Sequence, residues 1–233
     1  MNPKSDGQIL MEICDNLNKL NYTKDSYATR LVEKHQFEDG FIVESNLRRQ
    51  LIGLYYENKQ IGILGFSVKK GNLNIDGLQG IPNKKIKYPS NWYEHLLNPL
   101  IISSIKAYEN PINLSQKLTY DIISSKALES RIEEIKINLE KARKEVKNLK
   151  KTPENEIAFR RLEYNEKQLI LQNNRLLFTK KVRDDYFTKE GFLNLNKARV
   201  ISIVKAHTNH LLHNHKAPLV KPKPKVVPIK KKR

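Results

Sequence analysis

Four of the six histidines lie within nine residues near the C-terminal end, at His207, His210, His213 and His215. The first three are three residues apart, so a helix would bring them to one side, where imidazoles could bind a transition metal. No carboxylate or cysteine lies nearby in the sequence to complete or support a ligand set. We therefore expect surface histidines rather than ligands, and no metal cofactor.

Other catalytic patterns are missing from the sequence. It contains no Gly-x-Ser-x-Gly, phosphate-binding glycine loop or Cys-x-x-Cys motif. The single cysteine, Cys14, falls on the apolar face of an expected helix, where a thiol is usually buried and inert. One cysteine excludes a disulfide framework and is typical of a reducing compartment.

The N-terminus and the most apolar stretch of the chain indicate the cellular compartment. The N-terminus is polar and lacks the apolar core of a signal peptide. The most apolar stretch, 96–105, is too short and too polar to span a membrane. We expect an intracellular, cytoplasmic protein with no membrane span, or a nuclear one if the source is eukaryotic or viral.

The formal net charge of +18 is concentrated in two segments. Residues 124–183 carry a net charge of +7, and residues 216–233 carry eight basic side chains and no acidic one. Such segments attract polyanions such as nucleic acid, although a lysine-rich composition alone can also produce them. The tail alternates lysine with proline and should be disordered. Its expected phosphate contacts are Lys221, Lys223, Lys225, Lys230, Lys231, Lys232 and Arg233.

The clearest structural signal lies in residues 126–178. Apolar residues recur at alternating spacings of three and four from Ile132 to Leu149, and then at spacings of four and seven from Ala158 to Leu176. Thr152 and Pro153 separate the two runs and suit the start of a new helix. We predict an antiparallel helical hairpin. Its basic tip would bind nucleic acid or a nucleoprotein through Lys144, Lys147, Lys150 and Lys151, and its seam could dock on a protein partner.

The rest of the chain predicts an α+β fold in which an antiparallel three-stranded meander has flanking helices. Residues 1–123 and 182–206 form the two parts of this core, 124–181 the inserted hairpin, and 207–233 a His-rich and then Lys/Pro-rich tail. The expected elements are helices over 6–20 and 24–35, three strands within 50–80, a helix over 90–108 kinked or split at Pro99, a strand within 112–122 and a strand over 198–206.

This order of elements, with the segments LNIDGLQGIPNKK (73–85) and VRDDYFTKEGF (182–192), resembles the acyl-CoA N-acyltransferase (GNAT) superfamily over roughly 50–123 and 182–204. The resemblance implies that amides at the start of the helix after the meander hold the pyrophosphate of acetyl-CoA. The residues in that place are Gln79 and Gly80, with Lys84 and Lys85 adding positive charge. The chain departs from the family because no second glycine follows Gly80.

The catalytic residues implied by the resemblance are less defined. Phe187 holds the place of a tyrosine that is the general acid in many relatives, and Tyr186 is its neighbour. Glu44, Glu57 and Asp76 are candidates for the base that takes a proton from an amine. Two functions therefore stay open. One is an acyl-CoA-dependent acyltransferase or a non-catalytic relative of one, and the other is a nucleic-acid- or nucleoprotein-binding protein with the α/β part as scaffold.

Overall fold

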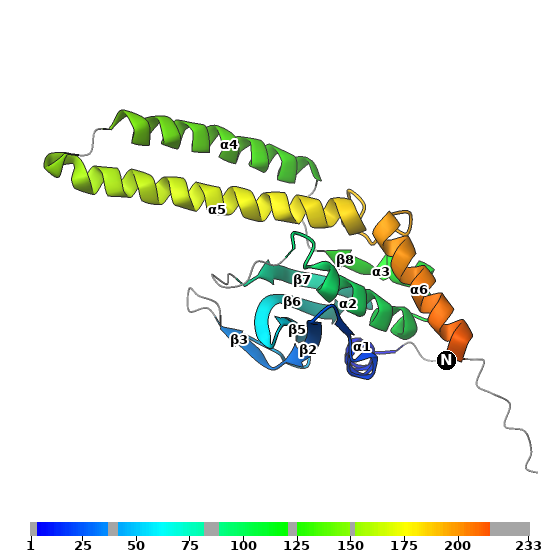
Figure 1. Cartoon of the computed structure of the whole chain (residues 1–233). Coiled ribbons are helices and arrows are strands. Elements are labelled where there is room, and N and C mark those ends of the chain that lie inside the picture. Colours follow the sequence, from blue (N-terminus) through cyan, green and yellow to red (C-terminus); the bar gives the residue numbers. More distant parts are fainter. Residues whose placement is uncertain (1–3, 37–41, 82–88, 121–124, 150–151, 215–233) are drawn as a thin grey trace, which may run out of the picture.

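The computed structural model describes residues 4–36, 42–81, 89–120, 125–149 and 152–214 (Figure 1). Helices and strands are mixed, as the sequence predicts. The helices are α1 Asp6–Leu20, α2 Glu94–Ala107, α3 Pro111–Lys117, α4 Ser125–Asn148, α5 Glu156–Tyr186 and α6 Ala198–Asn214, with a 3-10 turn, η1, at Pro153–Asn155.

Six strands form one curled mixed sheet in the order β1-β2-β5-β6-β7-β8. Neighbours are antiparallel except β7 and β8, which are parallel. The strands of this sheet are β1 Thr23–Lys24, β2 Tyr27–Val32, β5 Arg49–Tyr56, β6 Lys59–Lys69, β7 Asn72–Gly80 and β8 Leu118–Tyr120, while β3 Lys34–Gln36 and β4 Ile42–Glu44 form a separate pair.

Tight turns connect the central strands because residues suited to a positive φ stand between them. Lys70 and Gly71 have φ of 52° and 74° in the β6–β7 turn, where the sequence predicts a hairpin. The carboxylate of Asp6 accepts hydrogen bonds from both of their amides, at 2.8 and 2.7 Å. The N-terminal helix is thereby fixed to the end of the sheet.

The main core lies between the sheet and the two helices α1 and α2. Alternate residues of β6, Leu64, Phe66 and Val68, belong to it together with Ile13 of α1 and Leu97 of α2. Trp92 packs closely on Gly62, and a Cβ at Gly62 would stand 2.5 Å from the indole ring. The glycine therefore sets how closely the start of α2 approaches β6. These two helices and the sheet, with α3 and α6, make up what we call the body.

Helices α4 and α5 lie side by side and project from the body as an arm (Figure 1). Their buried seam on α4 includes Leu128, Ile132 and Leu139. Arg143 pairs with Glu166 at 3.2 Å and Arg183 with Glu129 at 3.6 Å, so the end of α4 faces the first half of α5 and its start faces the end of α5. The two helices are therefore antiparallel. Ala158, which the spacing placed in the seam, is exposed.

The helix predicted over 24–35 is wrong, because these residues form β1, β2 and the start of β3. Tyr27 and Leu31 share one face in either structure, since residues four apart align in a helix and in a strand alike. The turn at Asp25 and Ser26, with φ of 51° and 67°, closes a β1–β2 hairpin. The segment is therefore extended and not helical.

The strand predicted over 198–206 is also wrong, because this segment is the start of α6. Val200 and Ile203 are buried on one face of α6 against α2 and α5. Packing thus outweighs the preference of β-branched residues for strands. Of the strand predicted within 112–122, Leu118–Tyr120 is extended and Pro111–Lys117 forms α3, while 121 and 122 lie outside the described residues.

The helix expected over 90–108 begins later than the capping residues suggest. Neither Ser90 nor Asn91 caps it, since α2 begins at Glu94 after a turn through 90–93. It continues through Pro99 to Ala107 without a break.

Candidate functional site

The residues implied to bind acetyl-CoA lie at the end of β7. Gln79 and Gly80 are the last two residues of that strand, paired with Ile63 and Gly62 of β6. Lys84 and Lys85 lie outside the described residues. Strand β8 pairs only with Leu73–Ile75, so beyond Ile75 the strand β7 has no partner on its β8 side among the described residues.

The start of α2 is poorly suited to hold a pyrophosphate. An anion site at a helix start needs unpaired amides. Here the amides of Trp92, Glu94 and His95 already donate to the carbonyls of residues 89, 91 and 92, at 3.0 to 3.1 Å. Glu94 adds a carboxylate in the first turn, paired with Arg199 at 2.9 Å. The described part of this helix start therefore offers an anion few donors and one repelling charge.

The end of α5 also covers this place. Phe178 stacks on Trp92 with ring centroids 5.4 Å apart. The hydroxyl of Tyr93 donates to the Asp185 carboxylate, and Lys181 donates to the carbonyl of Ser90 at 3.2 Å. The root of the arm thus packs directly on the start of α2.

Tyr186, the candidate general acid, is fully buried. Its hydroxyl donates to the amide oxygen of Asn98 in α2 at 2.7 Å. Burial, and secondly the nearby Glu94 carboxylate, raise the pKa of Tyr186 far above its ordinary value. A phenol that is buried and hydrogen-bonded in this way holds α5 on α2, and is not exposed to a substrate.

Two of the candidate bases are surface carboxylates away from Tyr186. Glu57 occupies the β5–β6 turn with a φ of 47° and is exposed. Glu44 is exposed at the end of β4, opposite Lys34 of β3. Neither lies beside another of the proposed catalytic residues among the contacts that the structure describes.

Asp76 lies in a polar cluster on the sheet face opposite the core. It is the extra residue of a β-bulge, since Gly65 pairs with Gly77 and Phe66 with Ile75. Its carboxylate accepts hydrogen bonds from Arg49 at 3.1 Å and from Ser67 at 3.0 Å. Both of its oxygens are therefore engaged, which leaves Asp76 better suited to binding or structure than to proton abstraction.

A second polar cluster joins α2 to the start of β2. Tyr22 and Nδ1 of His95 are 3.0 Å apart, and Tyr27 stacks on the His95 ring with centroids 4.0 Å apart. Burial, and secondly the charge of Lys24, lower the pKa of His95 below its ordinary value. The Asp25 carboxylate acts in the opposite direction and raises this pKa.

The cysteine and histidine expectations have different outcomes. Cys14 is half-buried, and burial followed by the Asp15 carboxylate raises the pKa of its thiol to about 11, so it is a weak nucleophile. His207 is buried, which corrects the expectation of a surface histidine there.

No group of three metal-binding side chains occurs within the described ranges. Nor does any described helix combine the length and apolarity needed to cross a membrane.

The basic residues predicted at the tip of the arm lie only partly in the described chain. Lys144 is exposed on α4, and so is Lys147. The acidic residues Glu140 and Glu145 lie on the same exposed side of that helix, so its charge there is mixed. Lys150, Lys151 and the tail residues from Lys221 to Arg233 lie outside the described residues.

The face of α5 turned away from α4 was missed in the sequence, and it carries a cluster of basic side chains. Its cationic residues are Arg160, Arg161, Lys167 and Arg175, all exposed. Taking 100° per residue, they lie within about 60° of Tyr164 around the helix. Glu156 pairs with Arg160 at 2.6 Å, and Glu163 lies at the margin of this face. We call this surface the outer face of α5. A helical-wheel plot of the charged residues would have shown this face.

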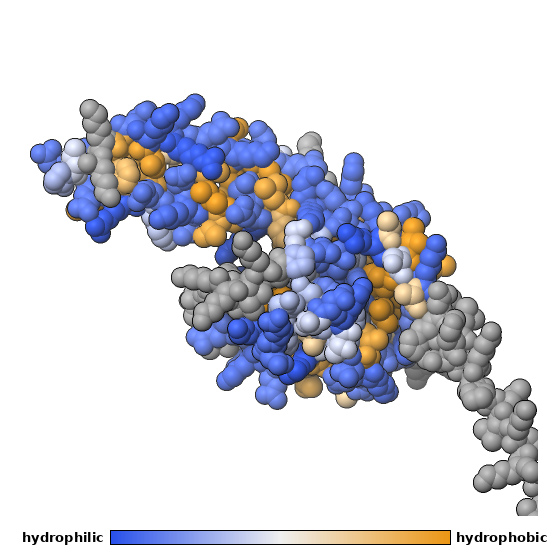
Figure 2. Space-filling model, viewed as in Figure 1, coloured by the Kyte–Doolittle hydropathy of each residue, from blue (hydrophilic) through white to orange (hydrophobic). Residues whose placement is uncertain are grey.

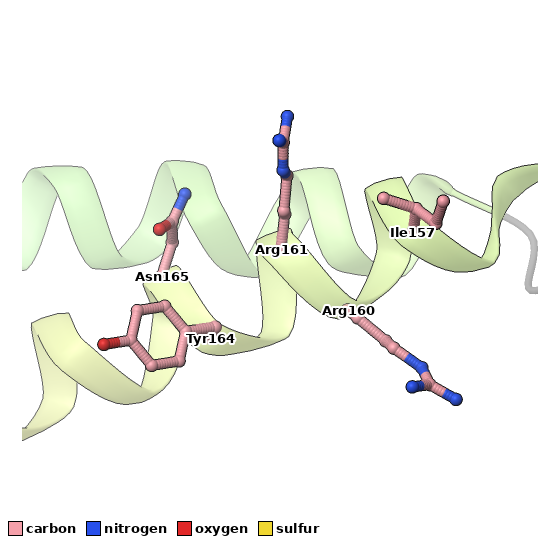
Figure 3. Close-up of a pocket in the computed structure, with 5 residues that line it drawn as sticks. All are labelled: Ile157, Arg160, Arg161, Tyr164 and Asn165. Carbon is pink, nitrogen blue, oxygen red and sulfur yellow. The ribbon is translucent and has the colours of Figure 1, made fainter.

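A shallow hollow of about 460 Å³ lies on this face, lined by Ile157, Arg160, Arg161, Tyr164 and Asn165 (Figure 3). Arg160 and Arg161 point away from each other, and the five side chains spread over the helix surface (Figure 3). Over the arm, apolar side chains come to a surface that is otherwise mostly hydrophilic (Figure 2). The geometry is that of a broad, open surface and not of an enclosed ligand site.

In comparisons with known proteins, no protein family, curated protein or solved structure matches the chain. The function is therefore argued from the site alone.

Proposed function

We propose that this protein binds nucleic acid through its arm and its basic tail, and that the α/β body is the scaffold that carries them. The observation that carries the proposal is the outer face of α5, where four cations lie within about 60° of Tyr164. Lys144 and Lys147 of α4, with Lys150, Lys151 and the tail, add further positive charge.

The dimensions of the arm support this proposal. With 31 residues, α5 is about 46 Å long. Its four cations extend over 16 residues, from Arg160 to Arg175, or roughly 23 Å along the axis. Phosphates recur every few ångströms along a nucleic acid, so each cation can meet one. Tyr164, at the centre of the face, offers a ring on which an unpaired base can stack.

The test is the salt dependence of binding to a single-stranded RNA of about 20 nucleotides. Replacing Arg160, Arg161, Lys167 and Arg175 with glutamine removes four phosphate contacts. We expect the slope of log K against log salt to fall by up to about 3, at roughly 0.7 per contact. The matched control replaces four exposed lysines of the body, Lys19, Lys59, Lys69 and Lys106.

An unchanged slope in the α5 variant, or equal effects of the two sets of replacements, would contradict a role of this face. A chain ending at His215 tests the tail in the same assay. Loss of its lysines should also lower the slope, and an unchanged slope would count against the tail.

A second candidate function is acyl transfer from a CoA thioester. It is supported by the order of the sheet, in which β5, β6 and β7 are antiparallel and β8 returns parallel to β7 after α2. Gln79 and Gly80, the cofactor contacts implied by the resemblance, lie in the part of β7 beyond Ile75, which does not pair with β8 among the described residues. Glu57 is the exposed catalytic candidate, because Tyr186 is buried and both oxygens of Asp76 are engaged. Gln79, Gly80, Lys84 and Lys85 are the implied cofactor contacts.

Thermal unfolding with and without acetyl-CoA in high salt tests this second candidate. High salt suppresses loose binding of phosphates to lysines, and a ligand of the folded state raises the midpoint. A rise would favour the acyltransferase or a non-catalytic CoA-binding relative. No rise, together with salt-dependent RNA binding, would leave the first proposal.

A further inference from the structure

Three large apolar side chains are exposed on the outer face of α5 at intervals of seven residues. Ile157, Tyr164 and Leu171 have 77%, 62% and 50% of their surface exposed. We call them the outer stripe. Isolated exposed apolar residues need no explanation, but a repeat of seven places all three in one line along a helix.

The next position in this repeat shows what such a side chain does when it has a partner. Phe178, seven residues after Leu171, stacks on Trp92 and meets Tyr93 edge-on where α5 reaches the body. The stripe is thus one continuous line that is covered at the root of the arm. The seam with α4 lies on the other side of α5, so a helix laid on the stripe would give the arm a third helix.

The charges beside the stripe define the partner. Arg160, Arg161, Lys167 and Arg175 flank it, and only Arg160 has an acidic partner among the described ion pairs. In helix pairs the charges beside an apolar seam select a partner of opposite sign. A helix with acidic residues at these flanking positions fits the outer face.

The same charges exclude two other occupants. A second copy of the arm would set arginines against arginines across the seam, which is repulsive. The chain's own tail from Lys216 to Arg233 carries eight basic residues and no acid, so it would be repelled as well.

We propose that the outer stripe docks an amphipathic helix of an acidic protein partner. The apolar side of that helix packs on Ile157, Tyr164 and Leu171, and its flanking glutamates or aspartates pair with the four cations. The inference does not depend on RNA binding by the arm, because it rests on the apolar side chains rather than on the cations alone.

The experiment uses the full chain and a labelled synthetic peptide of about three heptads, with leucine at a and d and glutamate at e and g. Like charges keep such a peptide from pairing with itself. A second peptide carries lysine in place of each glutamate. We expect the acidic peptide to bind and to become helical by circular dichroism, and the basic peptide not to bind.

The variant replaces Ile157, Tyr164 and Leu171 with serine, and we expect the affinity for the acidic peptide to fall about tenfold or more. The matched control is Ile137→Ser, which removes an apolar side chain 60% exposed on α4. It should change the affinity less than twofold. An unaltered far-ultraviolet circular dichroism spectrum shows that each variant retains the arm.

Four results would overturn the inference. The acidic peptide could fail to bind at about 0.1 mM, or both peptides could bind equally well. The serine variant could bind the acidic peptide as tightly as the wild type, which would place the peptide on the cations alone. The wild-type chain could form a dimer in sedimentation velocity that the serine variant abolishes. The salt slope for RNA, measured separately, reports on the proposed function and not on this site.

Discussion

Several side chains of types able to do chemistry are already hydrogen-bonded within the protein. Tyr186 is bonded to Asn98, Tyr93 to Asp185, and both oxygens of Asp76 are engaged. The sequence identifies Tyr186 and Asp76 as residue types able to do chemistry. It cannot show that their polar atoms are already paired, because the partners lie 88 residues away for Tyr186 and 27 for Arg49 of the Asp76 pair.

His95 should make the stability of the protein depend on pH. Its folded pKa lies below the ordinary value near 6.5, so the unfolded chain binds more protons there. This part of the stability is present above pH 6.5 and is lost as the pH falls through the folded pKa. Tyr22 and Tyr27 touch the ring, and Lys24 and Asp25 are the charges that act on it.

The measurement is urea unfolding of wild type and His95→Gln at pH 7.5 and 5.5, followed by the emission of the single tryptophan, Trp92. The wild type should lose more stability on acidification than the variant. Equal losses would assign the dependence to other groups, and His35→Gln is the comparison, because burial lowers the pKa of His35 too.

The secondary-structure elements were predictable where the pattern has one reading and a turn marks each end. The hairpin turn at Lys70 and Gly71 is such a case, and the alternating runs of β5 and β6 flank recognisable turns. The segment at 24–35 was not, since Tyr27 and Leu31 suit a helix and a strand equally. In α6, contacts with α2 and α5 outweigh the local preference of Val200 and Ile203, and no such contact is visible in the sequence.

The close approach of α2 to the sheet should depend on the absence of a side chain in Gly62. Gly62→Ala places a Cβ 2.5 Å from a Trp92 ring that Phe178 holds from the other side. The ring must shift, and we expect a loss of about 1–3 kcal/mol in the free energy of unfolding. Urea unfolding measures it, with a change in Trp92 emission.

Gly77→Ala is the matched control on the neighbouring strand. A Cβ there meets no atom within 4 Å, so the change should cost well under that of Gly62→Ala. If the two variants were equally destabilised, the loss would come from the strand backbone and not from the contact with Trp92.

At the scale of the whole molecule, the body and the arm have separate apolar interiors. The main core includes Val182 and Tyr186 from the end of α5 but none of the seam residues of α4. The antiparallel hairpin follows from the repeat in the sequence. Its outer face was not predicted, although a helical-wheel plot of the charges of α5 shows it once the repeat defines the buried side.

Removal of the arm should therefore leave a folded body. The ion pair between Arg183 and Glu129 holds the two ends of the arm together, so a short Gly-Ser linker in place of 133–175 can connect them. We expect cooperative unfolding with Trp92 emission close to that of the full chain, and loss of the arm's part of RNA binding. A body that unfolds non-cooperatively would contradict its independent folding. A body that binds RNA with the original salt slope would contradict the role of the arm in binding.

The free end of the arm and the end of α6, from which the lysine-proline tail continues, lie at opposite extremes of the molecule (Figure 1). A short oligonucleotide can reach one of these two positions and not both. A strand long enough to bridge them gains the second attachment at a high effective concentration. Under the proposed function, the distance between these two positions would set a minimum ligand length. The protein would then select nucleic acids by their length and independently of base sequence.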